Sequence, residues 1–214
     1  MEREIDFNDS IHISSQQSVL GGTLMIPKNS HALIIFVDDQ GKGQHDSRNV
    51  HVAQILQREG FATLLVDLLT SDEVANQPNT LNINHLAERI GDVCKWASLN
   101  PQTEHLNIGV FGYNTGVAAV LKAVSLQEIN IYAIVSLNGR PDLAMEELKK
   151  IRTPLLLIAG HKDNPMVTFN EKALPHIQAE TKLELLQDSD KNFLEPVILD
   201  KIATMSKEWF IRHT

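Results

Sequence analysis

The sequence has few of the features that mark secreted, membrane-bound or disulfide-linked proteins. It contains a single cysteine, Cys94, so an internal disulfide cannot form and a reducing compartment is expected. Its apolar runs are far shorter than the roughly 20 residues that a membrane span needs. The first residues also lack the apolar core of a secretory signal. These absences predict a cytoplasmic protein with no membrane partner.

Positive charge is also scarce in this chain. The 19 Lys and Arg residues stand against 27 Asp and Glu residues, and the net charge of −8 argues against nucleic acid as a partner. The nine histidines show no metal-ligand spacing, so we expect no metal and no cofactor. A chain of 214 residues is long enough to bury one substantial core. We therefore expect a single domain over residues 1–214, with the oligomeric state open, a homodimer included.

Segments with the pattern of strands and helices alternate along the chain. The expected strands are 10–16, 19–26, 32–37, 62–68, 107–111, 131–137, 154–160 and 182–187. The expected helices are 49–58, 82–99, a segment from residue 115 onward, a short one ending near residue 150, and 195–212. Near-continuous apolar strands that alternate with helices predict an α/β fold, with a parallel sheet covered on both faces. The first two strands predict an antiparallel hairpin, and the polar stretch 71–80 predicts a surface loop.

The most informative stretch is Gly112-Tyr113-Asn114-Thr115-Gly116, between an expected strand and an expected helix. It has the form of the Gly-x-Ser-x-Gly strand–turn–helix elbow, with Asn114 in the place of the serine. Such a turn presents its central residue at the carboxyl end of the sheet, beside helix N–H groups. We therefore expect Tyr113, Asn114 and Thr115 to line a binding site.

Three further stretches accompany the elbow: 60–70, 139–144 (Gly-Arg-Pro-Asp-Leu-Ala) and 160–163 (Gly-His-Lys-Asp). In their order and spacing, these stretches resemble the small, lidless dienelactone-hydrolase-related family of α/β-hydrolases. The resemblance covers nearly the whole chain. It implies an α/β-hydrolase fold: a mostly parallel sheet with helices on both faces, an N-terminal antiparallel hairpin and no lid domain. It also implies ester or lactone hydrolysis by a serine, a histidine and a carboxylate.

The triad that the resemblance implies is degenerate in this sequence. The carboxylate position is retained as Asp163, but the serine position is Asn114, whose amide nitrogen is a poor nucleophile. The histidine is expected shortly before the last helix, where the alignment places Lys191. A lysine is normally protonated at neutral pH and accepts no proton. We expect Lys191 to form an ion pair with Asp163 in the place of the histidine–carboxylate hydrogen bond.

The loop that supplies oxyanion donors departs from the family pattern as well. A His-Gly-x-Gly sequence is expected after strand 32–37, but the chain reads Asp38-Asp39-Gln40-Gly41. Carboxylates at this place oppose the negative charge of a tetrahedral transition state. Asp38, Asp39 and Asp163 are instead candidates for ligand contacts, and carboxylates of this kind suit a hard cation.

Arg140 and His161 are the remaining candidates for a binding site. Arg140 is placed either near the pocket, where it would contact an anionic group, or in a turn before a helix that Asp142 caps. His161 is either a substitute base or an ordinary loop residue. Arg48 and Asn49 match the family pattern at the start of the first crossover helix, where we expect them to brace loop 38–47.

These observations favour a non-catalytic pseudo-hydrolase that binds a small molecule or a protein partner. Losing the triad nucleophile or base costs a serine hydrolase about 10⁶-fold in rate, so serine-type hydrolysis is not expected. One alternative is a hydrolase of the dienelactone or esterase type, with chemistry rerouted through Asp163, His161 or a carboxylate-bound metal. A second alternative is a structural or assembly protein.

Overall fold

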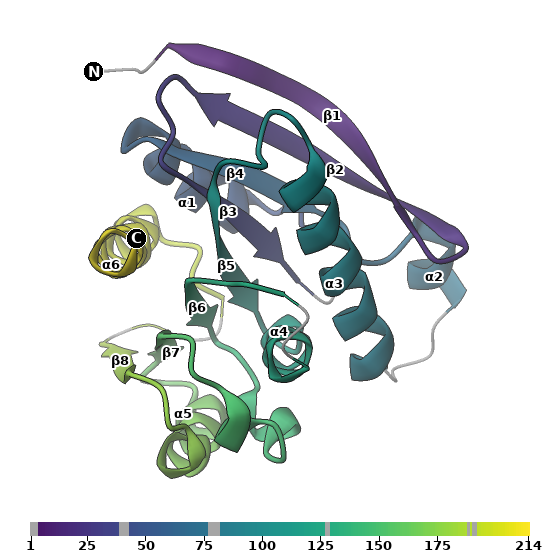
Figure 1. Cartoon of the computed structure of the whole chain (residues 1–214). Coiled ribbons are helices and arrows are strands. Elements are labelled where there is room, and N and C mark those ends of the chain that lie inside the picture. The colour runs from purple at the N-terminus through teal and green to yellow at the C-terminus, as the bar shows by residue number, and fades with distance from the viewer. Residues whose placement is uncertain (1–3, 39–42, 77–81, 127–128, 188, 190–191) are drawn as a thin grey trace.

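A computed structural model of the chain describes residues 4–38, 43–76, 82–126, 129–187, 189 and 192–214. Its centre is an eight-stranded sheet in the order β1-β2-β4-β3-β5-β6-β7-β8 (Figure 1). The strands are β1 (Ile5–Ser15), β2 (Ser18–Pro27), β3 (Ala32–Val37), β4 (Phe61–Val66), β5 (Asn107–Tyr113), β6 (Ala133–Leu137), β7 (Leu155–Gly160) and β8 (Thr181–Leu186). The strands β3 to β8 are parallel, whereas β1 pairs antiparallel with β2, and β2 antiparallel with β4. This arrangement confirms the predicted α/β sheet with a leading hairpin.

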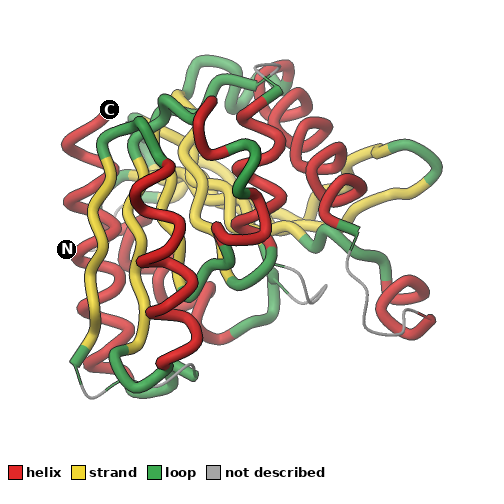
Figure 2. The backbone as a smooth tube through the Cα atoms, turned by 90° about the horizontal axis from the view of Figure 1, so that it is seen from below, coloured by secondary structure: helices red, strands yellow, loops and turns green. Residues whose placement is uncertain are grey.

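Helices cover both faces of the sheet. They are α1 (Ser47–Arg58), α2 (Ser71–Asn76), α3 (Ile83–Leu99), α4 (Gly116–Ser125), α5 (Asn164–Ala173) and α6 (Pro196–His213), with short 3-10 turns at Pro141–Ala144, Leu148–Lys150 and Leu174–His176. One core cluster joins the sheet to α3, α4 and α5, and a second joins it to α1 and α6. The tube in Figure 2 shows these two layers of helices on either side of the strands.

The two core clusters explain why the central strands have no polar face. In β3, Leu33 and Ile35 belong to the cluster under α3 and α4, while Ile34 and Phe36 belong to the cluster under α1 and α6. Because successive side chains point to opposite faces, a strand covered on both sides must be apolar throughout. The carboxyl ends of these parallel strands lie at one edge, which holds the elbow.

Two helices lie where the sequence analysis places none. The predicted loop 71–80 contains α2, which begins with a capping box: Glu73 Oε2 accepts from the Thr70 amide at 2.8 Å, and the Glu73 amide donates to Thr70 Oγ1 at 3.3 Å. The prediction of a loop there is wrong. Between β7 and β8 the helix α5 begins directly after Asp163, which accepts a hydrogen bond as its N-cap. Both helices carry their starting signal in the sequence.

Candidate functional site

The elbow joins β5 to α4, and Asn114 stands at its tip. Asn114 has a φ of 50°, in the left-handed region that few residues other than glycine occupy. Hydrogen bonds fix this conformation: the Asn114 amide donates to the Leu137 carbonyl at 3.3 Å, and the Asn114 carbonyl accepts from the Arg140 amide at 3.1 Å. The backbone therefore has the sharp turn of a nucleophile elbow, but it presents a carboxamide.

Glycines on both sides of Asn114 allow this turn. A Cβ at Gly112 would lie 3.0 Å from Val117 Cγ2, and a Cβ at Gly116 would lie 3.3 Å from the Asp38 backbone. Each position is tighter than an ordinary carbon contact, so side chains there would push α4 away from the sheet. The close approach of helix and strand therefore favours glycine at both positions.

Tyr113 is nearly buried directly before the tip, and its ring is held by Arg48 from α1. The Arg48 guanidinium lies 4.2 Å from the centre of the Tyr113 ring and donates from Nη1 to the tyrosine oxygen at 2.5 Å. The same guanidinium donates from Nε to Asp46 Oδ1 at 2.9 Å, and Asp46 also caps α1. Hydrogen bonding to Asp46 raises the pKa of Arg48 against the opposing effect of burial. This contact anchors the elbow to α1, a role the sequence analysis did not assign to Arg48.

The Asp46 carboxyl is ionised in spite of its partial burial. Burial acts to raise its pKa, but the hydrogen bonds and charge of Arg48 outweigh that effect and hold the pKa below its ordinary value. The neighbouring Asn49 donates from Nδ2 to the Gly43 carbonyl at 3.2 Å. Asn49 therefore holds the end of loop 38–47, as the sequence analysis predicts.

Asp38, the first residue of the oxyanion loop, is almost completely buried. Only 2% of its surface is exposed, and its backbone packs against Gly116 at the start of α4. Its carboxylate points toward Gly43, since a Cβ on that glycine would lie 3.3 Å from Asp38 Oδ2. Such a residue offers little surface to a ligand. Asp39 lies outside the described residues, so its predicted ligand contact stays a prediction.

Asp163 lies at the same edge of the sheet, and each of its carboxylate oxygens accepts a hydrogen bond. One oxygen accepts from the Met166 amide at 3.4 Å as the N-cap of α5, and the other accepts from Asn138 Nδ2 at 3.0 Å. Asn138 is buried, has a φ of 46° and also accepts from the Gly160 amide at 3.3 Å. The sequence analysis missed Asn138. Lys191 lies outside the described residues, so its ion pair with Asp163 remains untested.

Arg140 lies close to the elbow but carries a paired charge. Its guanidinium makes two hydrogen bonds of 2.8 Å to Asp142 and lies 4.1 Å from the ring centre of Phe169. Hydrogen bonding to Asp142 raises the pKa of Arg140. Asp142 therefore serves as the partner of Arg140, and its predicted role as a helix cap is wrong, since the 3-10 turn there has no side-chain cap.

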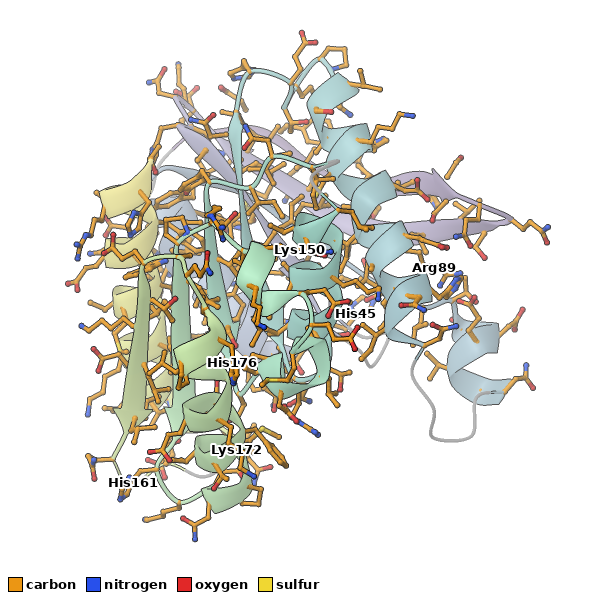
Figure 3. The ribbon with its side chains drawn as sticks, turned by 60° about the horizontal axis from the view of Figure 1, so that its bottom comes forward. His45, Arg89, Lys150, His161, Lys172 and His176 are labelled. Carbon is orange, nitrogen blue, oxygen red and sulfur yellow. The ribbon has the colours of Figure 1, made fainter. Side chains whose placement is uncertain are left out.

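The remaining predicted residues differ in exposure. Thr115 is half-buried beside Asn114, whereas His161 is exposed at the margin of the molecule, where Figure 3 labels it. The His161 amide donates to the Leu186 carbonyl at 3.0 Å. Next to this loop is a cavity of about 320 Å³. Its lining residues are Lys162, Ser189, Asn192, Phe193, Leu194, Glu195 and Ile198.

Arg48 links the wall of this cavity to the elbow, because its Nη1 donates to the Asn192 carbonyl at 3.4 Å.

Within the part of the chain that the structure describes, no group of three or more His, Cys, Asp or Glu residues is arranged to hold a metal. None of the described helices has the length and apolarity needed to cross a membrane.

Comparison with solved structures places this geometry among known folds. A dienelactone hydrolase from Anabaena variabilis is 34% identical, with a TM-score of 0.91 over 97% of this chain and 98% of that one. Est1E from Butyrivibrio proteoclasticus is 15% identical, with a TM-score of 0.78 over 95% of this chain and 98% of that one, which shows a shared fold. The α/β-hydrolase fold that the resemblance implies is thereby confirmed.

Comparison with curated proteins finds relatives that are longer than this chain. Proteins from two strains of Mycobacterium tuberculosis, both described as a putative phosphoribosyl transferase, are 35% identical over 206 residues. The match covers 96% of this chain but 46% of each relative, so the chain spans about half the length of these relatives. The model of the dienelactone hydrolase family matches residues 20–197, which is most of the chain. The chain therefore belongs to the dienelactone hydrolase family.

Proposed function

We propose that this chain is a non-catalytic member of its family, which binds a ligand at the elbow without hydrolysing it. The observation that carries the proposal is Asn114 at the tip of the elbow, with a φ of 50°. The backbone is shaped for a nucleophile, yet the amide nitrogen has its lone pair delocalised into the carbonyl. A carboxamide at this position can donate and accept hydrogen bonds, which suits binding.

The bonding of Asp163 supports the same proposal. In a working triad the carboxylate orients a histidine. Here both Asp163 oxygens accept hydrogen bonds from the chain itself, from the Met166 amide and the Asn138 side chain. The carboxylate that would orient a base is thus used to begin α5 and to fix the end of β6.

The expected loss in rate is large. Removal of the nucleophile or the base costs about 10⁶-fold, and the residual rate relies on oxyanion stabilisation. In this chain the oxyanion loop begins with the buried Asp38, where the family pattern has His-Gly. With these losses combined, we expect no serine-type hydrolysis.

Binding without turnover is the property to test. Amide NMR spectra of the protein would be recorded with small lactones and aryl esters, and the same samples assayed for product over a day. We expect saturable shifts of the Tyr113, Asn114 and Thr115 amides, with the ligand intact. Rapid product formation that disappears in Asp163→Ala would instead support the rerouted hydrolase.

We also propose that a phosphoribosyltransferase is the protein partner of this chain. The support is the relation of lengths: nearly the whole chain matches less than half of each mycobacterial relative described as a phosphoribosyl transferase. Two domains that are fused in one protein often occur elsewhere as two separate chains that bind each other, because their functions are used together. The non-catalytic unit would then act as a ligand-binding companion.

The partner proposal is tested with the mycobacterial relative. Its segment outside the match would be expressed alone and, if folded by circular dichroism, titrated with this chain in a light-scattering experiment. We expect a saturable 1:1 complex. A folded segment that shows no association at high micromolar concentration would reject this partner and leave the proposed ligand binding unaffected.

A further inference from the structure

A cavity separate from the elbow lies between α3, α4 and the turn of the hairpin. Its volume is about 820 Å³, within the range of small-molecule sites. Its lining residues are Gln16, Ala87, Glu88, Gly91, Asp92, Cys94, Lys95, Ser98, Ile108, Ala123, Leu126, Ile129 and Asn130. We call it the α3–α4 groove. Along α3 it runs from Glu88 to Ser98, about 15 Å at 1.5 Å per residue.

Small side chains keep this groove open. Ala87, Gly91, Cys94 and Ser98 lie on the side of α3 that lines it, and Ala123 lies on α4. Gly91 is the informative one, because a Cβ built there meets nothing within 4 Å. Glycine inside a helix is less stable than alanine, and no close approach compels it here. The glycine therefore enlarges the groove at the expense of helix stability.

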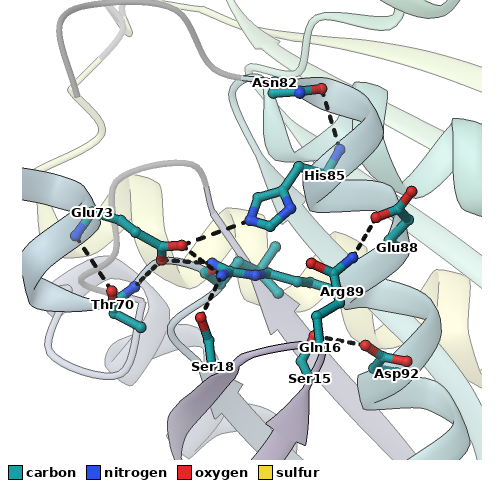
Figure 4. Close-up of polar contacts among 11 residues, drawn as sticks. Ser15, Gln16, Ser18, Thr70, Glu73, Asn82, His85, Glu88, Arg89 and Asp92 are labelled. Atoms are coloured by element: carbon teal, nitrogen blue, oxygen red, sulfur yellow. Dashed lines mark hydrogen bonds and ion pairs between the residues drawn. The ribbon is translucent and has the colours of Figure 1, made fainter. Parts of the chain in front are cut away.

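The groove has an acidic end with preorganised acceptors. Gln16 Nε2 donates to Glu88 Oε2, and Ser15 Oγ donates to Asp92 Oδ2 at 2.6 Å (Figure 4). Both donors are neutral, so they orient the carboxylates without neutralising them. No other hydrogen bond or ion pair from the described residues engages the second oxygens, Oε1 of Glu88 and Oδ1 of Asp92. Like charges four residues apart on a helix also repel each other.

The rest of the groove is mostly apolar. Ile108 and Ala123 are buried at its floor, and Ile129 is half-buried at its rim. Leu126 is 54% exposed on the same rim, so it offers apolar surface to an incoming molecule. The lining charges are Glu88, Asp92 and Lys95, which sum to −1. The ligand that fits these features is a cation with an apolar chain.

We propose that the α3–α4 groove binds an amphipathic organic amine, with its ammonium group between Glu88 and Asp92 and its apolar chain along Ile108, Ala123 and Leu126. The ammonium group supplies the donors for the two remaining carboxylate oxygens and relieves the repulsion between them. The apolar chain of the amine covers the exposed Leu126 and the open space beside Gly91. This site is separate from the elbow, and the proposal does not depend on the function proposed there.

The test uses n-hexylammonium, n-hexanoate and 1-hexanol as matched probes in amide NMR titrations of the whole chain at neutral pH. We expect saturable shifts of α3 and α4 amides with hexylammonium, and binding at least about tenfold weaker for the two other probes. The double variant E88Q/D92N keeps the shape but removes the charge, and it should weaken hexylammonium binding by at least about tenfold.

Two substitutions at Gly91 separate the groove from general effects on folding. Gly91→Ala should retain binding, whereas Gly91→Leu fills the groove and should abolish it; both residues favour helix, so both variants should remain folded. The proposal is overturned by any of three results. These are no saturable shift up to about 20 mM hexylammonium, equal binding of hexanoate, or unchanged hexylammonium binding in E88Q/D92N or Gly91→Leu.

Discussion

The ion pair between Arg89 and Glu73 gives a quantitative prediction about stability. Arg89 on α3 is 1% exposed, and its guanidinium donates to Glu73 twice, at 2.7 and 2.6 Å, as Figure 4 shows. It also donates to the Leu68 carbonyl at 2.5 Å and to Ser18 Oγ at 3.0 Å. This buried cation thereby joins α2, α3, the segment after β4 and the hairpin.

The magnitude follows from the pKa of Glu73. Hydrogen bonding to Arg89 is the main cause that lowers this pKa from 4.5 to about 2. A difference of about 2.5 units corresponds to at most about 3.4 kcal/mol. The Glu73 side chain is 27% exposed, so solvent screening reduces the contribution to about 2 kcal/mol. We expect Glu73→Gln to lower the free energy of unfolding by about that amount at pH 7.

The pH dependence has a definite sign. Because the folded-state pKa of Glu73 is depressed, its contribution is complete above the unfolded value of 4.5 and is lost as pH falls toward about 2. About two fifths of the contribution should be gone at pH 3.5. The stability difference between wild type and Glu73→Gln should therefore shrink between pH 6 and pH 3.5.

Urea unfolding of four proteins provides the assay: wild type, Glu73→Gln, Arg89→Met and the double variant. Arg89→Met should cost about 2–4 kcal/mol, because it removes every bond of the guanidinium. The coupling energy of the two substitutions should be at least about 1.5 kcal/mol. Additive effects, or a difference between wild type and Glu73→Gln that is constant with pH, would refute this reasoning.

Three further predictions concern the elbow and the loops around it. Gly139→Ala should destabilise the protein by about 2–4 kcal/mol, because the new Cβ would lie 2.1 Å from Ser136 Oγ. Thermal unfolding measures this loss, and a midpoint temperature equal to that of the wild type would contradict the prediction. Asn114→Gly should be neutral or stabilise by up to about 1 kcal/mol, while Asn114→Val should destabilise by about 1–2 kcal/mol, given the φ of 50°. The reverse order in urea unfolding would show that the turn is not left-handed. Arg48→Met should raise the pKa of Asp46, since burial is then opposed only by the hydrogen bonds from the backbone amides of residues 48 and 49. Carboxyl NMR titration measures this pKa, and an unchanged value would exclude the Arg48 side chain as the cause.

The sheet could be predicted because the sequence of each central strand is itself typical of a buried strand. Strands such as β3 and β7 are apolar at almost every position, and the turns between elements contain glycine or polar residues. The elbow was found for a related reason, since its five residues are contiguous. The start of α2 was equally visible as a capping box at Thr70 and Glu73, but the polar composition of the segment favoured the prediction of a loop.

The contacts of the site could not be read from spacing alone. Arg48 meets Tyr113 across 65 residues, and Asn138 meets Asp163 across 25. Such pairs depend on which strands become neighbours in the sheet, and this is decided by the whole fold. Asp163 shows the consequence: the sequence analysis assigned it to the triad carboxylate position, and the fold adds that it is the N-cap of α5. Asp38 was likewise predicted as a ligand contact, but burial leaves it little surface.

The most direct test of the central claim is the hydrolysis of activated esters and lactones by wild-type protein of high purity. Asn114→Ala and Asp163→Ala would be assayed in parallel, each with and without a chelator. A non-catalytic elbow predicts the same background rate in all three proteins under both conditions. Turnover by the wild type that Asp163→Ala abolishes, or that the chelator removes, would contradict the account and establish a rerouted hydrolase.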